Sequence, residues 1–335
     1  MQTALRWALI GASDIAATRI LPAIRAVGDE AVVVRSGDAN HGSAWALANG
    51  VAESVTDLSA ALLRSDVDAV YVSSLNTFHR EHVEAAASAG KHVLAEKPLA
   101  MNLSDARAMV DACRHADVVM ATNHHLPASP THRVMKALVR SGELGEIRAI
   151  RFHHAVMLPT RLQGWRVDDP NEGGVIYDVT VHDAASIAAI LGTQAIRAMA
   201  IGLNQDNDPR GPVDAVMSTI EWEGDVLVST HDSYNNAHLA TSVHILGTKG
   251  ALVADNCNTG DPVGSISLYH DQQWSAVEIP DREDLYERTI RAFGSAVRGE
   301  GEPIVTGEDG VRSLAVAIAV AEATKSKARV MVERT

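Results

Sequence analysis

Short apolar runs alternate with amphipathic stretches over the first 120 or so residues of the chain. The runs that predict strands cover residues 8–10, 31–34, 67–73, 91–95 and 118–121. Between them, the spacing of apolar positions predicts helices over residues 15–27, 43–49, 79–89 and 104–115. Strands that alternate with helices are typical of βαβ units. The pattern therefore predicts an α/β fold that begins with a doubly wound, parallel Rossmann sheet.

The pattern changes after Leu144 and Gly145. Apolar and polar residues then alternate along segments separated by turn residues, at 147–155, 213–222, 226–231 and 241–246. Such alternation indicates a large, mostly antiparallel sheet with one covered face and one open face. Helices follow over residues 285–297 and 309–323, and we expect them to pack back on the first domain. The second part of the chain is therefore predicted to be an α+β domain.

Length and composition narrow the class of protein. A chain of 335 residues exceeds what one core usually serves, which favours two domains. Its net charge of −13 opposes binding to nucleic acid or to an anionic membrane, so we expect neither partner. The start of the chain has no leader-like pattern, and we expect a cytoplasmic protein. Cys113 and Cys257 stand alone, without the spacing of a disulfide framework or a zinc site.

A glycine follows the first predicted strand. Gly11 opens the run Gly11-Ala12-Ser13-Asp14-Ile15-Ala16, which leads into the first predicted helix. Glycine lets the chain turn sharply there, and the free N–H groups at a helix start bind a pyrophosphate. Ser13 and Ala16 occupy positions where glycine is commonest, so an ordinary turn is the competing interpretation. The position at the first βα junction favours a dinucleotide site made by Gly11, Ala12, Ser13, Asp14 and Ile15.

The end of the second predicted strand bears on the choice of cofactor. An acidic residue there would hold a ribose 2′-hydroxyl, whereas cationic and small polar residues suit a 2′-phosphate. This strand ends in Arg35, Ser36 and Gly37, and His41 follows. These residues predict a preference for NADP(H), with NAD(H) as the alternative. In the competing interpretation, Arg35 only pairs with Asp38 in a solvated loop.

Other stretches carry residues suited to hydride transfer. Glu96-Lys97-Pro98 ends a strand of the parallel sheet, at the edge where ligands bind in such folds. Asp178 and His182 stand four apart, on one face if a single helix covers both. An ammonium at Lys97 polarises a carbonyl oxygen, His182 relays a proton at neutral pH, and Asp178 fixes the imidazole or binds a substrate hydroxyl. We predict Lys97, Asp178 and His182 as catalytic residues.

Glu96-Lys97-Pro98 and the run from Gly173-Gly174 to His182 together resemble the glucose-fructose oxidoreductase and inositol dehydrogenase family over nearly the whole chain. Five further runs, at 68–73, 91–94, 122–125, 162–166 and 306–311, are similar to family members that reduce a 2-keto sugar with NADPH. The resemblance implies an NAD(P)-dependent oxidoreductase that acts on a small sugar. Residues 1–123 would form its dinucleotide-binding domain and residues 124–335 its substrate-binding domain.

The resemblance also implies further cofactor contacts. Besides residues 12–15, 36, 37 and 41, they are Ser74, Leu75, Asn76, Thr77, Phe78, His79, Glu96, Lys97, Asn123, Trp165, Arg166 and Tyr286. Two departures from those sugar reductases concern the 2′-phosphate. They have arginine where His41 stands, and Ser-Thr where this chain has Ser36-Gly37. The change at His41 weakens the binding of the 2′-phosphate at neutral pH, and Arg35, which precedes Ser36-Gly37, is expected to compensate.

Several alternatives are weighed against this interpretation. Paired histidines, His124-His125 and His153-His154, suggest a metal, but neighbouring residues of a strand point to opposite faces, so we predict no metal site. A sugar or inositol dehydrogenase is the alternative within the family. A cofactor-bound sensor without turnover and an NAD-dependent glycosidase are alternatives of other classes, and the intact Lys97, Asp178 and His182 argue against the sensor. Self-association could use the open sheet face.

Overall fold

The computed structural model describes residues 4–205 and 211–334. It divides into two compact units, each described by itself below. The first contains the chain up to His125 together with Tyr286–Val311, and the second contains Leu126–Leu285 and Arg312 onward. In the described residues, no helix combines the length and apolar character needed to cross a membrane.

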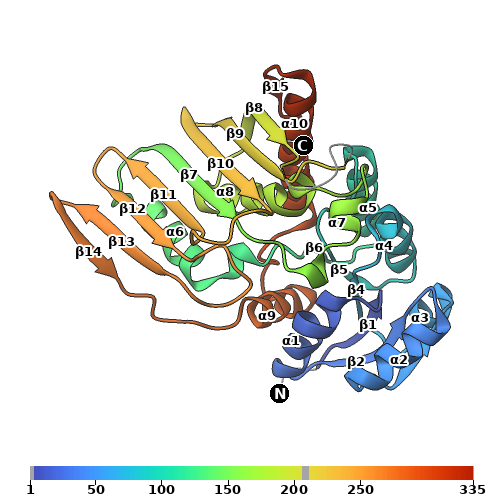
Figure 1. The fold of residues 1–335 in the computed structure, drawn as a ribbon. Helices are drawn as coiled ribbons and strands as arrows, with labels where there is room; N and C mark the ends of the chain where they lie inside the picture. The colour runs from blue at the N-terminus through green and yellow to red at the C-terminus, as the bar shows by residue number, and fades with distance from the viewer. Residues whose placement is uncertain (1–3, 206–210, 335) are drawn as a thin grey trace. The chain divides into compact units, whose positions relative to one another are not determined.

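A six-stranded parallel sheet forms the centre of the first unit, in the order β3-β2-β1-β4-β5-β6 (Figure 1). Its strands are β1 Arg6–Ile10, β2 Glu30–Arg35, β3 Glu53–Val55, β4 Ala69–Val72, β5 His92–Ala95 and β6 Met120–Thr122. Strands β1 and β4 are buried from Trp7 to Ile10 and from Ala69 to Val72. The predicted Rossmann sheet is confirmed. The short β3 escaped prediction because its three residues carry no apolar run.

Four helices of this unit lie between strands as predicted, whereas the short helix that follows β3 was not predicted. The helices of the unit are α1 Leu21–Ala26, α2 Ala39–Asn49, α3 Leu58–Leu62, α4 His79–Ser88, α5 Leu103–His115 and α9 Leu285–Val297. A single wide π-helical turn, Ala16–Ile20, precedes α1. The predicted start of α2 at Ser43 is wrong, because the Asp38 carboxylate caps the helix by accepting from His41 N at 2.8 Å. His41 therefore lies in the first helical turn.

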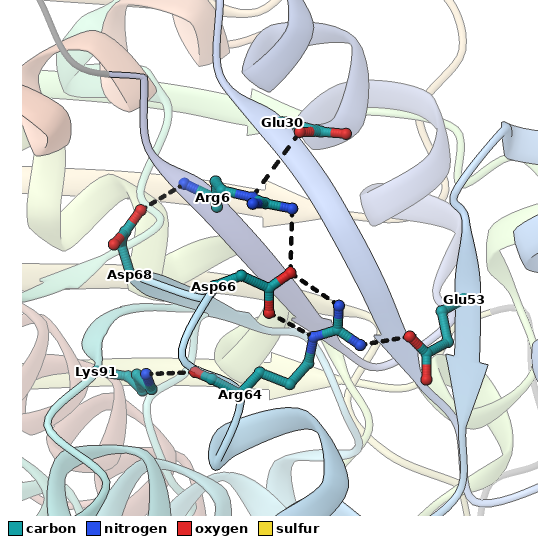
Figure 2. Close-up of polar contacts among 7 residues, drawn as sticks. All are labelled: Arg6, Glu30, Glu53, Arg64, Asp66, Asp68 and Lys91. Carbon is teal, nitrogen blue, oxygen red and sulfur yellow. Dashed lines mark hydrogen bonds and ion pairs between the residues drawn. The ribbon is translucent and has the colours of Figure 1, made fainter.

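Charged side chains join the strands at the amino edge of this sheet (Figure 2). Arg64 pairs with Asp66 and Glu53, Arg6 Nη2 lies 3.0 Å from Asp66 Oδ2, and Lys91 Nζ donates to the Arg64 carbonyl at 2.9 Å. The hydrogen bonds that Arg64 donates to these two carboxylates raise its pKa further above the already high value. Ion pairs therefore occupy the amino edge of the sheet. Ligands of doubly wound sheets bind at the opposite, carboxyl edge.

The second unit contains a nine-stranded sheet in the order β14-β13-β12-β11-β7-β10-β9-β8-β15. Its strands are β7 Ile147–Ala155, β8 Ala195–Leu203, β9 Ala215–Trp222, β10 Val226–Ser233, β11 Ser242–Gly247, β12 Ala251–Asp255, β13 Ser265–His270, β14 Gln273–Val277 and β15 Val330–Met331. All neighbouring strands are antiparallel except β7 and β10, which run parallel. The predicted, mostly antiparallel sheet is confirmed.

One face of this sheet is open and largely apolar on its β8 side. Side chains at least half exposed there include Met199, Ile201, Leu203, Met217 and Leu227. The register places Ile201 beside Met217, and Met217 beside His231. Self-association through this face stays a prediction.

Helices complete the second unit. They are α6 Pro130–Arg140, the short α7 Trp165–Asp168, α8 Val181–Leu191 and α10 Gly307–Ser326, whose first five residues belong to the first unit. A second π-helical turn, Ile176–Thr180, leads directly into α8 and is called the 176–180 turn below. Gly192 ends α8 in the left-handed conformation. Asp178 lies in this turn and His182 in the first turn of α8.

Asp29 generates a stability prediction for the first unit. Its carboxylate accepts from Leu5 N at 2.9 Å and from the indole of the fully buried Trp7 at 3.1 Å. Asp29→Ala should lower the free energy of unfolding by about 1–3 kcal/mol, because two donors lose their acceptor. Glu30→Ala, at the exposed next position, should change it by about 0.5 kcal/mol or less. Urea unfolding measures both, and equal losses would contradict the role of Asp29.

Candidate active site

The predicted cofactor residues of the first unit lie at the carboxyl edge of its sheet. Gly11 follows β1, Ser36 follows β2, Ser74 comes soon after β4, Glu96 follows β5 and Asn123 follows β6. Strand order reverses between β1 and β4, and ligands of doubly wound sheets bind at such a switch point. The fold therefore gathers stretches that lie far apart in the sequence.

Gly11 occupies a position that no other residue fits. Its φ is +127°, and a Cβ atom there would lie 2.7 Å from the carbonyl carbon and oxygen of Ser73. The loop is also tied to its neighbours, because Gly11 N donates to Arg35 O at 3.0 Å and Ser13 Oγ lies 2.8 Å from Ser73 Oγ. The missing side chain leaves the backbone close to the switch point, as a pyrophosphate site requires. This geometry fits a dinucleotide.

The residues that bear on the 2′-phosphate cluster where β2 ends and α2 begins. Arg35 Nε donates to Thr56 O at 3.1 Å, and Asp38 caps α2. The competing interpretation of an Arg35–Asp38 pair is therefore wrong. His41 Nε2 lies 3.0 Å from Ala12 O, which ties the first turn of α2 to the glycine loop. Ser36 is buried beside them.

The loop from Ser74 to His79 contains a single 3-10 turn, Asn76–Phe78, before α4. Leu75 and Phe78 are exposed, and the ring of Phe78 stacks on that of His82 at 5.9 Å. His79, by contrast, is completely buried between two backbone carbonyls, with Nε2 3.0 Å from Ser74 O and Nδ1 3.1 Å from Leu99 O. Burial lowers the pKa of His79. In the structure this histidine braces the loop.

A buried polar network surrounds the Glu96-Lys97 step. Tyr71 Oη and Asn123 Nδ2 both donate to Glu96 Oε1, each at 2.5 Å. His124 is buried, and burial together with the Lys97 charge lowers the pKa of His124 to about 3, so its ring is neutral. The Lys97–Pro98 peptide bond is cis. The cationic Lys97 side chain is thus close to the neutral imidazole of His124, and Lys97 follows Glu96, whose carboxylate is fixed by two donors.

Two further observations test the fit of a cofactor at this edge. Asn123 is buried, and its Oδ1 has no donor among the residues that the structure describes. A buried acceptor of this kind needs a donor, which an amide or hydroxyl of a bound dinucleotide would provide. Tyr286, in α9, stacks on His125 at 5.2 Å with the Arg19 guanidinium 5.7 Å from its ring centre. The residues at this edge fit a dinucleotide.

In the second unit, Asp178 is held by two donors. Arg166 Nε donates to Asp178 Oδ2 at 2.9 Å, and Tyr234 Oη donates to the same oxygen at 3.0 Å. The Arg166 guanidinium lies 4.6 Å from the ring centre of Trp165. Asp178 and His182 are both buried. The Trp165-Arg166 pair predicted as a cofactor contact is therefore also part of the structure that fixes Asp178.

Tyr234 was missed by sequence reasoning. Burial and the nearby Asp178 charge raise the pKa of Tyr234 well above its usual value, so the phenol remains a donor at neutral pH. Tyr234 lies just past the end of β10, and the predicted strand over 226–231 stopped before it. The available signal was the polar run Asp232-Ser233-Tyr234 at the end of an alternating strand.

Gly11 provides a test of the cofactor loop. Gly11→Ala should destabilise the loop by about 1–3 kcal/mol and weaken dinucleotide binding, because the new methyl group meets the Ser73 backbone. Gly28→Ala is the control: Gly28 has φ +90° but nothing within 4 Å of an added Cβ. Fluorescence titration with NADPH measures binding. Unchanged affinity in Gly11→Ala would remove this loop from the dinucleotide site.

Comparison with known proteins assigns both parts of the chain. The model described as the NAD-binding Rossmann fold of an oxidoreductase family matches residues 5–124. The model of the C-terminal alpha/beta domain of the same family matches residues 136–332. Both models carry the family name GFO_IDH_MocA.

Individual relatives agree with this assignment. The chain is 44% identical to 1,5-anhydro-D-fructose reductase of Ensifer adhaerens, over 95% of this chain and 96% of that protein. It is 27% identical to a myo-inositol 2-dehydrogenase of Thermotoga maritima, over 85% of each. A solved levoglucosan dehydrogenase in complex with NADH and levoglucosan has the same fold, with a TM-score of 0.87 at 19% identity over 99% of this chain and 100% of that one. The resemblance seen in the sequence is confirmed: the chain belongs to the glucose-fructose oxidoreductase and inositol dehydrogenase (GFO_IDH_MocA) family of oxidoreductases.

Proposed function

We propose that this oxidoreductase uses NADPH to reduce a keto sugar, namely 1,5-anhydro-D-fructose to 1,5-anhydro-D-mannitol. The observation that carries the proposal is the 44% identity to a reductase of that name over 95% of the chain. In this proposal residues 1–123 form the dinucleotide-binding domain, and residues 124–335 form the substrate-binding domain. Cofactor and sugar are the ligands that the enzyme requires.

Three residues are proposed to carry the reaction. When bound, the nicotinamide supplies the hydride. The Lys97 ammonium donates a hydrogen bond to the substrate carbonyl oxygen and stabilises the negative charge that develops there. His182 donates the proton that turns this oxygen into a hydroxyl. Asp178, fixed by Arg166 and Tyr234, orients the imidazole or binds a neighbouring hydroxyl of the sugar.

The proposed preference for NADPH rests on the end of β2. Arg35 supplies a permanent cation, and Ser36 supplies a hydroxyl. The carboxylate of Asp38 is engaged by its cap of α2, so it does not take the place of the acid that holds a ribose 2′-hydroxyl. NAD(H) is the alternative cofactor.

A second candidate function, inositol oxidation, is favoured by the 27% identity to the myo-inositol 2-dehydrogenase. Sugars and inositols differ by single hydroxyls, and one buried donor left without its partner costs about 1–3 kcal/mol. A few contacts are therefore enough to redirect such a site from a keto sugar to a polyol.

A substrate panel tests the assignment. We expect kcat/KM with NADPH to be highest for 1,5-anhydro-D-fructose among that sugar, glucosone, fructose and inosose, and to be lower with NADH. Oxidation of myo-inositol and glucose with NADP⁺ or NAD⁺ serves as the reverse comparison. Inositol oxidation that is faster by tenfold or more would overturn the reductase assignment. A bound dinucleotide without net turnover would favour the glycosidase or sensor alternatives.

Lys97→Ala tests the catalytic assignment. Loss of a well-placed cationic donor should lower kcat by about two orders of magnitude, roughly 3 kcal/mol, with a much smaller effect on NADPH affinity. Lys249→Ala removes an exposed lysine elsewhere and should leave both values unchanged. Steady-state kinetics and NADPH titration separate the two effects. Near-normal kcat in Lys97→Ala would exclude this lysine from the reaction.

A further inference from the structure

Two aspartates lie completely buried beside the 176–180 turn. Asp183 comes from the first turn of α8 and Asp232 from the end of β10, and both have no exposed surface. The two carboxyl groups are close enough for each to shift the pKa of the other. Neither residue was singled out by the sequence, and neither has a role in the proposed reaction.

The hydrogen bonds around the pair can be counted oxygen by oxygen. His154 Nδ1 lies 2.7 Å from Asp183 Oδ1. The Thr180 hydroxyl donates to Asp232 Oδ2, and Thr230 Oγ1 donates to the same oxygen at 3.4 Å. The two remaining oxygens, Asp183 Oδ2 and Asp232 Oδ1, have no donor among the described residues. One proton between them would satisfy both, because it makes one carboxyl a donor to the other.

The electrostatics around the pair favour that proton. Burial raises the pKa of both aspartates well above 3.8, and the Asp183 charge raises that of Asp232 further. A hydrogen bond with Asp232 acts in the opposite direction on Asp183 and lowers its pKa. The other titratable groups that face the pair are His154 from β7 and the buried Cys257, whose pKa burial raises to about 12. Next to His154 lies His132, whose pKa burial and that neighbour lower to about 3.

Strand β10 is connected to the turn at two points. Asp232 accepts from Thr180, which lies two residues from both Asp178 and His182. Two residues beyond Asp232, Tyr234 donates to Asp178 itself. We propose that Asp183 and Asp232 share one proton and act as positioning residues for the turn that carries Asp178 and His182. The catalytic half of this inference rests on the proposed function, whereas the shared proton does not.

The shared proton links stability to pH. Because the raised pKa belongs to the folded state, the folded protein keeps a proton that the unfolded chain releases above its ordinary value of 3.8. The stabilisation is complete below that value and is lost as pH rises through the folded pKa. Within this window, one extra bound proton makes the folding equilibrium constant fall about tenfold per pH unit.

Asp232→Asn tests the proton directly. Its amide would donate to Asp183 and accept from Thr180, as the protonated acid does, but it has no proton to lose. Urea unfolding between pH 5 and 9 should therefore show a stability that falls less steeply with pH than in the wild type. Asp255→Asn, at an exposed aspartate of the same sheet, should keep the wild-type slope. Infrared difference spectra should show the carbonyl band of a protonated carboxylic acid in the wild type and its loss in Asp232→Asn.

Identical slopes for wild type and Asp232→Asn, or the absence of that band, would overturn the shared proton. These measurements use no substrate, so they decide the point even if the sugar assignment fails. Thr180→Val tests the positioning role, since it removes one hydroxyl from a buried site and leaves both aspartates in place. It should lower kcat about tenfold or more with little change in KM, because a small misplacement of reacting groups costs rate. Wild-type kcat in Thr180→Val would overturn the positioning role.

Discussion

The polar side chains central to the proposed reaction are buried or half-buried, so their positions depend on hydrogen bonds that replace those to water. Glu96 is held by Tyr71 and Asn123. Asp178 is held by Arg166 and Tyr234. These hydrogen bonds fix the position of each carboxylate. Loss of one donor would let the carboxylate move or would leave one of its oxygens without a partner. The requirement to satisfy buried polar atoms therefore constrains the geometry of the candidate site.

The carboxyl groups of Glu96 and Asp178 differ in role from those of Asp183 and Asp232. Glu96 and Asp178 accept hydrogen bonds from neutral or cationic donors. Asp183 and Asp232 face one another, where two charges would repel in a medium that screens poorly. A proton removes that repulsion and adds a hydrogen bond. The second unit thus contains one carboxylic acid, Asp232, that acts in its neutral form. Two residues further on, Tyr234 donates to Asp178, which acts as a carboxylate.

Much of the fold was predictable because its signals are local. The buried runs of β1, β4 and β5 and the partial alternation of β7 and β9 each appear within one short window of sequence. Two of the missed elements lack such a window: β3 has three residues, and β14 is exposed over its first four of five positions, so no apolar period marks it. Strand β8 and helix α6 were also missed, although each is nine residues or longer. The predicted start of α2 was wrong because Asp38, which had been considered only as a partner for Arg35, caps the helix.

The candidate site was less predictable for a related reason. Glu96, Lys97, Asp178 and His182 belong to contiguous motifs, and the sequence alone placed them at strand and helix ends. Tyr234 and Asp232 touch the 176–180 turn from a strand some fifty residues later. That pairing depends on the register of β10, which no local pattern encodes. His79 lies inside a predicted contact loop, yet its buried ring contacts two backbone carbonyls, and only the fold shows this.

The two π-helical turns have a consequence for how such enzymes change. Each turn holds one more residue than an α-helical turn, and each lies between a loop proposed to meet a ligand and a helix packed in a core. Because of this extra residue, the chain before the turn can take a different direction while the helix after the turn keeps its orientation. The loop ahead of residue 176 can therefore be reshaped for a new sugar, and the loop ahead of residue 16 for a different dinucleotide, while the buried faces of α1 and α8 stay in register. In this respect each wide turn separates a loop proposed to meet a ligand from the helix packed behind it.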